Sequence, residues 1–290
     1  MGIRHDLQRS IYQTLKHNRD GSYATQHDRK NILYKFADDL ITQGYGLRDI
    51  RGLKEKHILA IIKFWQKKEL KTSTIKNRTS VLRYLCVQIN KKNIVPSNKK
   101  LNLGRRRYVP TNNRALYDPD FSKISNIHVQ VSLQLQRVFG LRREEALKIK
   151  PWLADKGKYL VLDDSWCKGG RGRYIPILTD EQRFWLEQAK KILLSKGLSL
   201  IPIKKSYIQQ RSIYDKQVLR AGLKNLHGLR HAYAQRRYKE LTGWEAPING
   251  GSKASQLTSL QKQIDYEARM TLTEELGHSR EQITVNYLGR

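Results

Sequence analysis

Residues 225–237 read NLHGLRHAYAQRR, and this stretch does most to decide what the chain folds into. His227, Arg230 and His231 lie three and four residues apart, so a helix would stack them along one face. Taken alone, such a face is most simply a solvated basic surface. If His227 and Arg230 begin the helix, however, free backbone N–H groups, a guanidinium and an imidazole would converge on one phosphate.

The charge of the whole chain points to a polyanionic partner. Its 290 residues include 56 Lys and Arg against 26 Asp and Glu, for a net charge of +30. Residues 1–110 hold 25 basic against 8 acidic side chains, and residues 111–290 hold 31 against 18. Such a surface attracts nucleic acid in a salt-dependent way. Because both halves are basic, a basic tail on a neutral enzyme is excluded.

Length and cysteine content indicate the setting. A chain of 290 residues can form two domains whose cores need neither disulfide nor metal. Cys86 and Cys167 are far apart and suggest no disulfide framework, which predicts a reducing, cytoplasmic location. The charged N-terminus and the lack of a long apolar run predict no signal peptide and no membrane span.

The first half has the apolar spacing of a small helical bundle. Ile, Leu, Phe and Trp recur at helical intervals within residues 26–42, 58–65 and 82–89, which predicts three amphipathic helices. The first follows a turn at Asp20-Gly21-Ser22, and the hydroxyls of Thr72-Ser73-Thr74 are expected to cap the last.

A basic segment follows this bundle. Residues 91–107, KKNIVPSNKKLNLGRRR, contain seven Lys and Arg, no acid, one Pro and one Gly. This composition is typical of a linker. A polyanion could organise it.

The second half mixes strand and helix patterns. Residues 127–135, IHVQVSLQL, alternate like a half-buried strand but also fit a helix, so periodicity leaves both open. Residues 158–162 and 173–178 flank a glycine-rich turn, which predicts two short strands. Helical patterns dominate residues 180–241 and return at 260–276, and the Gly, Pro and Ser content of 242–259 predicts a loop.

Two basic candidates precede the opening stretch. Arg142 and Glu145 have the spacing of a routine helix-surface pair, but Glu145 could also orient a guanidinium whose fork fits two phosphate oxygens. Lys168 begins the glycine-rich turn, where a lysine is usually just solvated. A flexible turn could also bring its ammonium beside a leaving oxygen, provided that neighbouring cations lower the lysine pKa.

Two further candidates lie near the C-terminus, in LGHSREQITVNYLGR. His278 precedes Tyr287 by nine residues. A single tyrosine is ordinarily a packed aromatic, but a phenol can also attack phosphorus and hold the broken phosphodiester as a phosphotyrosyl bond. Each ordinary reading is the stronger one by itself. Together the candidates occur in one order and suit one reaction.

These residues resemble the tyrosine recombinase, or phage integrase, family. The matching set is Arg142 in GLRREEAL, Lys168 in CKGGRGRYIP, His227 and Arg230 in HGLRH, His278 in LGHS and Tyr287 in VNYLGR. The resemblance runs from about residue 138 to the end, and more loosely over the N-terminal part. It implies a mainly α fold with a small β-sheet: a helical core-binding domain with a basic linker (1–110, linker 91–110) and a mixed α/β catalytic domain (111–290). It also implies that 127–135 is a helix.

The resemblance implies a site-specific recombinase that integrates or excises a mobile element. Tyr287 would attack the scissile phosphate and become joined to the 3′ phosphate, and Lys168 would protonate the departing 5′-hydroxyl. Arg142 and Arg230 would neutralise the non-bridging oxygens, His227 and His278 would donate hydrogen bonds, and His227 could take the tyrosine proton. Glu145 would orient a guanidinium without itself touching the phosphate. No ATP, metal or other cofactor is implied, because the covalent bond stores the energy.

The partners expected are double-stranded DNA, further protomers up to a tetramer, and accessory DNA-bending proteins, with no membrane. Phosphate contacts are expected from basic residues of the linker and the glycine-rich turn: Lys91, Lys92, Lys99, Lys100, Arg105, Arg106, Arg107, Arg171 and Arg173.

Two features depart from the family pattern. Arg230 and His278 are separated by 48 residues, which is long, and the surplus is expected to be an insertion at 242–259 that leaves the site intact. Only three residues follow Tyr287, so the usual docking of a C-terminal segment on a neighbouring protomer is in question.

Two other functions fit the scaffold less well. A catalytically silent architectural or regulatory DNA-binding protein would have no use for the full set of reactive side chains. A type IB-like topoisomerase would relax supercoils without a target sequence, but the small size and the separate helical domain favour a recombinase.

Overall fold

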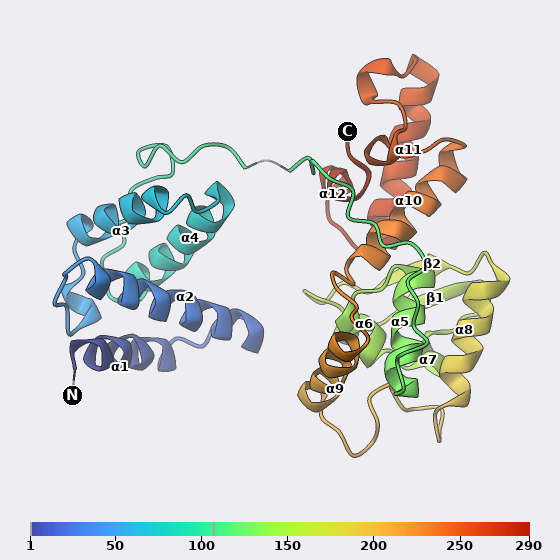
Figure 1. The fold of residues 1–290 in the computed structure, drawn as a ribbon, viewed down its shortest axis with the longest axis horizontal. Helices are drawn as coiled ribbons and strands as arrows, with labels where there is room; N and C mark the ends of the chain where they lie inside the picture. Colours follow the sequence, from blue (N-terminus) through green and yellow to red (C-terminus); the bar gives the residue numbers. More distant parts are fainter. Residues whose placement is uncertain (1, 107) are drawn as a thin grey trace. The chain divides into compact units, whose positions relative to one another are not determined.

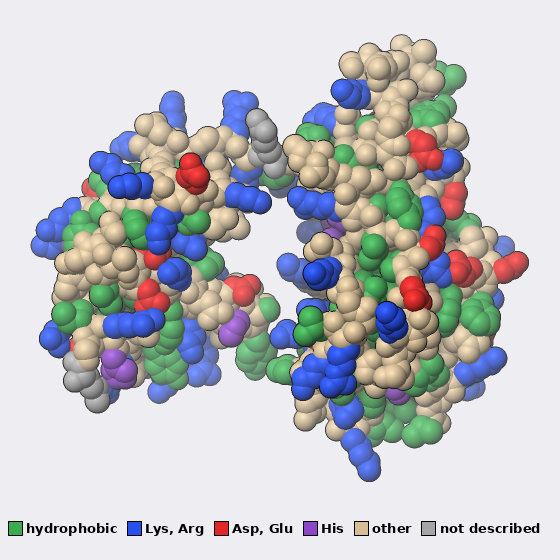
Figure 2. Space-filling view, in the orientation of Figure 1, with side chains coloured by type: hydrophobic (Ala, Val, Ile, Leu, Met, Phe, Trp, Pro, Cys, Tyr) green, Lys and Arg blue, Asp and Glu red, His purple; other side chains and the backbone are tan. Residues whose placement is uncertain are grey.

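The computed structural model describes residues 2–106 and 108–290 and divides the chain into two compact units, Met1–Arg107 and Tyr108–Arg290 (Figure 1). The fold is mainly α-helical, with one small antiparallel sheet in its described part, as the sequence predicts. No helix in the described ranges is both long and apolar enough to cross a membrane. Lys and Arg side chains cover the visible surface of both units far more densely than Asp and Glu (Figure 2).

The described part of the first unit contains four α-helices rather than the three predicted. They are α1 (Ile3–Lys16), α2 (Tyr23–Thr42), α3 (Glu55–Lys67) and α4 (Thr72–Gln88). Helix α1 escaped prediction because only Leu7 and Ile11 along its mostly polar sequence are buried. Ser22 caps α2 by accepting a hydrogen bond from the Thr25 amide. The predicted hydroxyl cap of α4 is wrong, because Thr72 already lies in the helix and Lys71 is the N-cap, without a side-chain bond.

Most of the expected linker is folded onto this first unit. Apolar side chains are interspersed among its lysines, and Val95 and Leu101 are buried in the core of the bundle. Arg83 fastens the segment by donating to the Pro96 carbonyl at 2.6 Å and to Asn98 Oδ1 at 3.0 Å. The prediction of a linker is therefore wrong for residues 91–103.

The second unit is built around helix α5 (Ile127–Phe139). Residues 127–135 are helical, as the family resemblance implied. Their sequence pattern is ambiguous because α5 is covered on several sides. One side packs against α8 (Asp180–Lys191), α10 (Gly228–Thr242) and the sheet, and Val129 and Leu133 face a second cluster with α9 (Tyr207–Arg220). A helix buried this widely loses the one-sided pattern that identifies most helices.

The two predicted strands form a hairpin. Strand β1 (Tyr159–Leu162) pairs antiparallel with β2 (Arg173–Pro176), and Leu162 lies opposite Arg173. Leu160, Leu162 and Ile175 point into the core. Gly169 and Gly170 in the connecting turn have positive φ angles of 77° and 61°, a conformation that glycine adopts without strain.

Further helices complete the described part of this unit. The short ones are α6 (Arg143–Lys148), α7 (Pro151–Ala154) and α12 (Val285–Leu288), which carries Tyr287, and the long one is α11 (Ser259–Glu275). The predicted loop 242–259 contains two single-turn 3-10 helices, Pro247–Asn249 and Ala254–Gln256. It is not a free loop: Ala246 is buried and Pro247–Asn249 packs against α12.

Candidate active site

The opening stretch folds as the start of α10. His227 is its N-cap and Arg230 lies in its first turn, as predicted. Gly228 sits between them because a Cβ there would meet the Arg114 carbonyl oxygen at 2.5 Å. The Leu116 amide donates to the Gly228 carbonyl at 2.9 Å, so residues 114–116 run against this turn.

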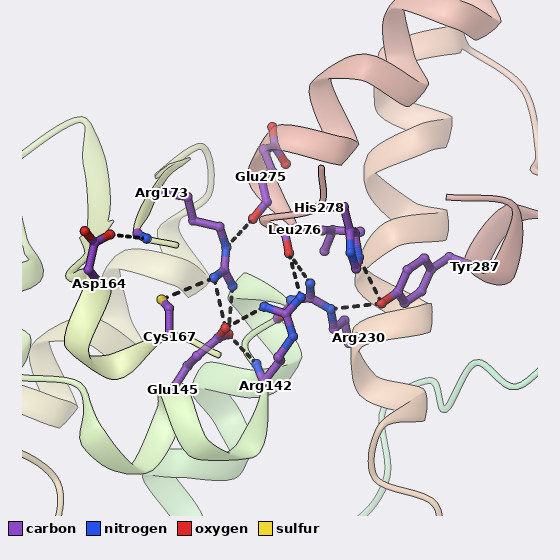
Figure 3. A network of polar contacts seen from close by, with 12 residues as sticks. Arg142, Glu145, Asp164, Cys167, Arg173, Arg230, Glu275, Leu276, His278 and Tyr287 are labelled. Carbon is purple, nitrogen blue, oxygen red and sulfur yellow. Dashed lines mark hydrogen bonds and ion pairs between the residues drawn. The ribbon is translucent and has the colours of Figure 1, made fainter. Parts of the chain in front are cut away.

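Arg230 is 1% exposed and is held by backbone oxygens. Its guanidinium donates to the Gly140 carbonyl at 2.5 Å and to the Leu276 carbonyl, and its Nε lies 3.3 Å from the hydroxyl oxygen of Tyr287 (Figure 3). Burial lowers the pKa of Arg230 to about 10, so the side chain remains a cation at neutral pH. A fixed, buried cation thus lies beside the phenol.

A second guanidinium comes from the N-cap of α6. Arg142 donates to Glu145 Oε1 at 2.6 Å and to the same Leu276 carbonyl that Arg230 uses, at 3.2 Å. The two arginines therefore converge on one oxygen. Glu145 also accepts from the Arg142 backbone amide at 2.7 Å, which satisfies one of the free N–H groups at the start of α6.

Glu145 is buried, and it is held from the other side by Arg173 of β2. Arg173 donates to both carboxylate oxygens, at 3.0 and 2.7 Å, and to the Glu275 carbonyl at 2.7 Å (Figure 3). Burial alone would raise the pKa of Glu145, but the bonds and charge of Arg173 and the charges of Arg230 and Arg142 lower it to about 2. The carboxylate is therefore ionised, and it orients two guanidinium groups.

Tyr287 and His278 meet next to this cluster. The phenol oxygen lies 3.2 Å from His278 Nε2, and the tyrosine is 5% exposed. The ring of His231 lies 4.7 Å from the tyrosine ring and that of His227 lies 6.3 Å away, between centroids. Arg142, Arg230, His278 and Tyr287, which lie up to 145 residues apart in the sequence, are thus gathered at one place, with His227 at its edge.

The imidazoles of this region are neutral at pH 7. Burial, followed by the charges of Arg230, Arg142 and Arg173, lowers the pKa of His278 to about 3. Burial and the neighbouring His227 lower the pKa of His231 to about 4, and burial with Arg230 also lowers that of His227. Each ring therefore has one N–H donor and one acceptor nitrogen.

Lys168 makes no polar contact with the other candidates in the described part of the chain. Its side chain is exposed in the turn between β1 and β2. The structure therefore gathers five of the six predicted reactive side chains and leaves the sixth on an exposed turn.

The predicted phosphate contacts divide into exposed and engaged side chains. Lys92, Lys99, Lys100, Arg105 and Arg171 are exposed. Arg106 donates to Asn77 Oδ1 at 2.7 Å, and Lys91 donates to the carbonyls of Arg51 and Leu53. Arg107 lies outside the described residues.

Arg173 corrects one of these predictions. It is 6% exposed, and Glu145 and the Glu275 carbonyl occupy its guanidinium, so a DNA phosphate does not reach it. The alternation of β2 carried a signal for this, because Arg173 shares the inward face with Ile175 whereas Tyr174 points outward. Sequence analysis placed His231 on the same helix face as His227 and Arg230 but gave it no role, and it did not single out Gln235. Both side chains are buried next to Tyr287.

Comparisons with known proteins agree on the family. Residues 6–95 match a family model described as "Phage integrase, N-terminal", and residues 110–236 match one described as "Integrase". No curated protein matches the sequence.

Solved structures with the same fold are distant in sequence. A lambda integrase dimer bound to a COC′ core site shares 16% identity with a TM-score of 0.60, covering 99% of this chain and 80% of that one. The XerH recombinase bound to palindromic difH substrate shares 16% identity with a TM-score of 0.59, and the match covers 98% of this chain and 81% of that one. The Tn1549 transposon integrase in complex with circular intermediate DNA shares 14% identity with a TM-score of 0.53, and the match covers 100% of this chain and 96% of that one. With two matched domains and this fold, the chain belongs to the tyrosine recombinase, or phage integrase, family.

Proposed function

We propose that this chain is a site-specific DNA recombinase that cleaves and rejoins DNA through a 3′-phosphotyrosyl intermediate, integrating or excising a mobile element. The observation that carries the proposal is the position of the Tyr287 hydroxyl, which lies within hydrogen-bond distance of both Arg230 and His278. A phenol placed between a buried cation and a neutral imidazole is suited to act as a nucleophile.

Arg142 and Arg230 bind the scissile phosphate in this mechanism. Both guanidinium groups converge on one neutral oxygen, that of Leu276, and a phosphate would take the place of backbone oxygens that they bind in this structure. Their charge has most effect in the pentacoordinate state, where negative charge grows on the non-bridging oxygens. Glu145 holds Arg142 in place for this task.

The proton of Tyr287 passes to a neutral histidine. His278 is better placed than His227, because its Nε2 lies 3.2 Å from the phenol oxygen. The tyrosine oxygen then forms a bond to phosphorus as the bond between phosphorus and the 5′ oxygen breaks. Lys168, carried by the glycine turn, gives its proton to that oxygen and leaves a free 5′-hydroxyl. Rejoining reverses these steps with a new 5′-hydroxyl.

Double-stranded DNA is the proposed substrate, and the exposed lysines and arginines of both units are its proposed phosphate contacts. The lambda integrase in the matched structure is a dimer on its core site. For this chain we propose likewise that several protomers, up to four, assemble on DNA, aided by DNA-bending proteins.

A nicked duplex tests the proposal, because loss of the short 5′ fragment traps the covalent intermediate. The wild-type chain is mixed in EDTA with nicked duplexes that carry the DNA flanking its gene, together with a random-sequence library. We expect a covalent protein–DNA adduct, and we expect Tyr287→Phe to abolish it while binding DNA with nearly unchanged affinity. An adduct that needs metal would refute this mechanism. Binding without an adduct on any duplex would favour a catalytically silent DNA-binding protein.

A further inference from the structure

The side-chain amide of Gln235 is fully hydrogen-bonded inside α10. Gln235 is 1% exposed, and its Nε2 donates to the main-chain oxygen of Tyr287 and to Asn113 Oδ1, both at 2.9 Å. Its Oε1 accepts from Asn113 Nδ2 at 3.1 Å and from the Tyr117 hydroxyl at 2.5 Å. An amide can make four hydrogen bonds, and all four are formed. The position of this side chain is therefore fully determined by its neighbours.

Asn113 is held in the same way. Besides its two bonds with Gln235, its Nδ2 donates to Asn249 Oδ1 at 3.2 Å and its Oδ1 accepts from the Ala115 amide at 2.9 Å. Asn249 belongs to the 242–259 segment and donates in turn to Glu245 at 2.8 Å. The amide network thus joins three parts of the chain: the segment after the linker, helix α10 and the 242–259 segment.

The same segment after the linker also supports the start of α10. We call residues 113–117 the linker-exit segment. Its Leu116 amide bonds to Gly228, which lies between His227 and Arg230. The linker-exit segment therefore contacts both ends of the site directly or through one side chain: the turn that carries Arg230, and the main chain of Tyr287.

Tyr287 depends on such support because its own helix is very short. Helix α12 has four residues, too few to hold a fixed geometry without tertiary contacts. Gln235 binds the carbonyl of the tyrosine itself, so a shift of this amide moves the phenol relative to Arg230. Displacing a reacting group by one ångström can slow a reaction by about 100-fold.

We propose that Gln235 and Asn113 are positioning residues through which the linker-exit segment sets the place of the Tyr287 nucleophile. This role rests on the proposed recombinase function. It assigns a task to two side chains that touch neither phosphate nor leaving group, and it makes the 242–259 segment part of the support of the site through Asn249.

The test measures binding and cleavage separately in the full-length chain. Gln235→Met removes the amide at similar length, Asn113→Ala removes its partner, and Asn112→Ala at the exposed neighbouring position is the matched control. On the nicked duplex at saturating protein, we expect Gln235→Met and Asn113→Ala to form the adduct about 10 to 100-fold more slowly, with unchanged DNA affinity. Asn112→Ala should cleave at the wild-type rate.

Two further readouts separate positioning from general damage to the fold. The double variant of Gln235→Met and Asn113→Ala should be no slower than Gln235→Met, because both changes break one unit. In Gln235→Glu, the rate relative to wild type should rise as the pH falls, because a protonated carboxyl regains the donor for the Tyr287 carbonyl. If Gln235→Met does not fold, the comparison of Asn113→Ala with Asn112→Ala carries the test.

The outcomes separate this role from the function on which it rests. A wild-type chain that forms no adduct overturns the recombinase function and this role with it. Wild-type cleavage together with Asn113→Ala and Gln235→Met rates within about twofold of it overturns the positioning role alone. A loss of DNA affinity that accounts for the whole loss of rate does the same.

Discussion

Arg173 and Glu145 form a bidentate ion pair from which water is nearly excluded, with their side chains 4% and 1% exposed. Glu145 uses the same carboxylate to hold Arg142. The guanidinium of Arg173 thus holds the carboxylate of Glu145 in place, and this carboxylate in turn holds the guanidinium of Arg142. Removing one member of such a buried set leaves a charge without its partner.

Glu145→Gln should destabilise the fold by about 3–5 kcal/mol at neutral pH, because Arg173 stays buried beside a neutral amide. The pKa of Glu145 is lowered from 4.5 to about 2, so the ionised form favours the folded state. This contribution is complete above about pH 4.5 and is lost as the pH falls toward 2. Urea denaturation at several pH values should show a deficit that shrinks on acidification. A deficit independent of pH would contradict the prediction.

His278→Gln should make the free energy of unfolding depend less on pH just below about pH 6.5. Burial and three nearby arginines lower the pKa of His278 from 6.5 to about 3, so the neutral ring favours the folded state. Its contribution is present above about pH 6.5 and is lost as the pH falls toward 3. The free energy of unfolding of the variant should therefore fall less between about pH 6.5 and 5 than that of the wild type. His17→Gln, at an exposed position, is the control, and equal slopes for the two variants would count against the assignment.

Arg171 and Arg173, two residues apart in the hairpin, should fail in different ways. Arg171 is exposed, so Arg171→Ala should leave stability unchanged. The plot of the logarithm of the DNA-binding constant against the logarithm of salt concentration should become less steep by about 0.9, the effect of losing one phosphate contact. Arg173→Ala should lower the melting temperature, because Glu145 loses its buried partner. DNA titrations at several salt concentrations and thermal melts measure the two effects. Equal salt slopes for Arg171→Ala and the wild type would show that Arg171 does not touch phosphate.

Lys168→Ala should be rescued by a better leaving group. If Lys168 protonates the departing 5′ oxygen, the variant should form adduct about 10² to 10⁴-fold more slowly on an ordinary nicked duplex. A duplex with sulfur in place of that oxygen should restore most of the rate, because a thiolate leaves without protonation. Arg230→Lys provides the contrast, since it acts on the phosphate and should stay slow with sulfur. An unrescued Lys168→Ala would assign the proton to another group.

The family resemblance indicated the class of fold, and the pattern of the sequence itself determined the two strands, most of the helices and the helix start at His227. Local patterns carry this information, because spacing of 2 or 3.6 residues decides which side chains share a face. Residues 127–135 fit both the strand pattern and the helix pattern, and there the family resemblance rather than periodicity indicated the helix. The lysines of residues 91–103 suggested a linker, but the apolar residues between them pack on the helical bundle.

Only the tertiary structure decided which side chains meet. It buried Arg173 behind Glu145, directed Arg142 and Arg230 at the Leu276 carbonyl, and tied Asn113 to Tyr287 through Gln235. These contacts join positions from 28 to 134 residues apart, so no local period records them. An arginine reads the same in sequence whether it faces solvent or a buried carboxylate, and the packing of the elements around it decides which.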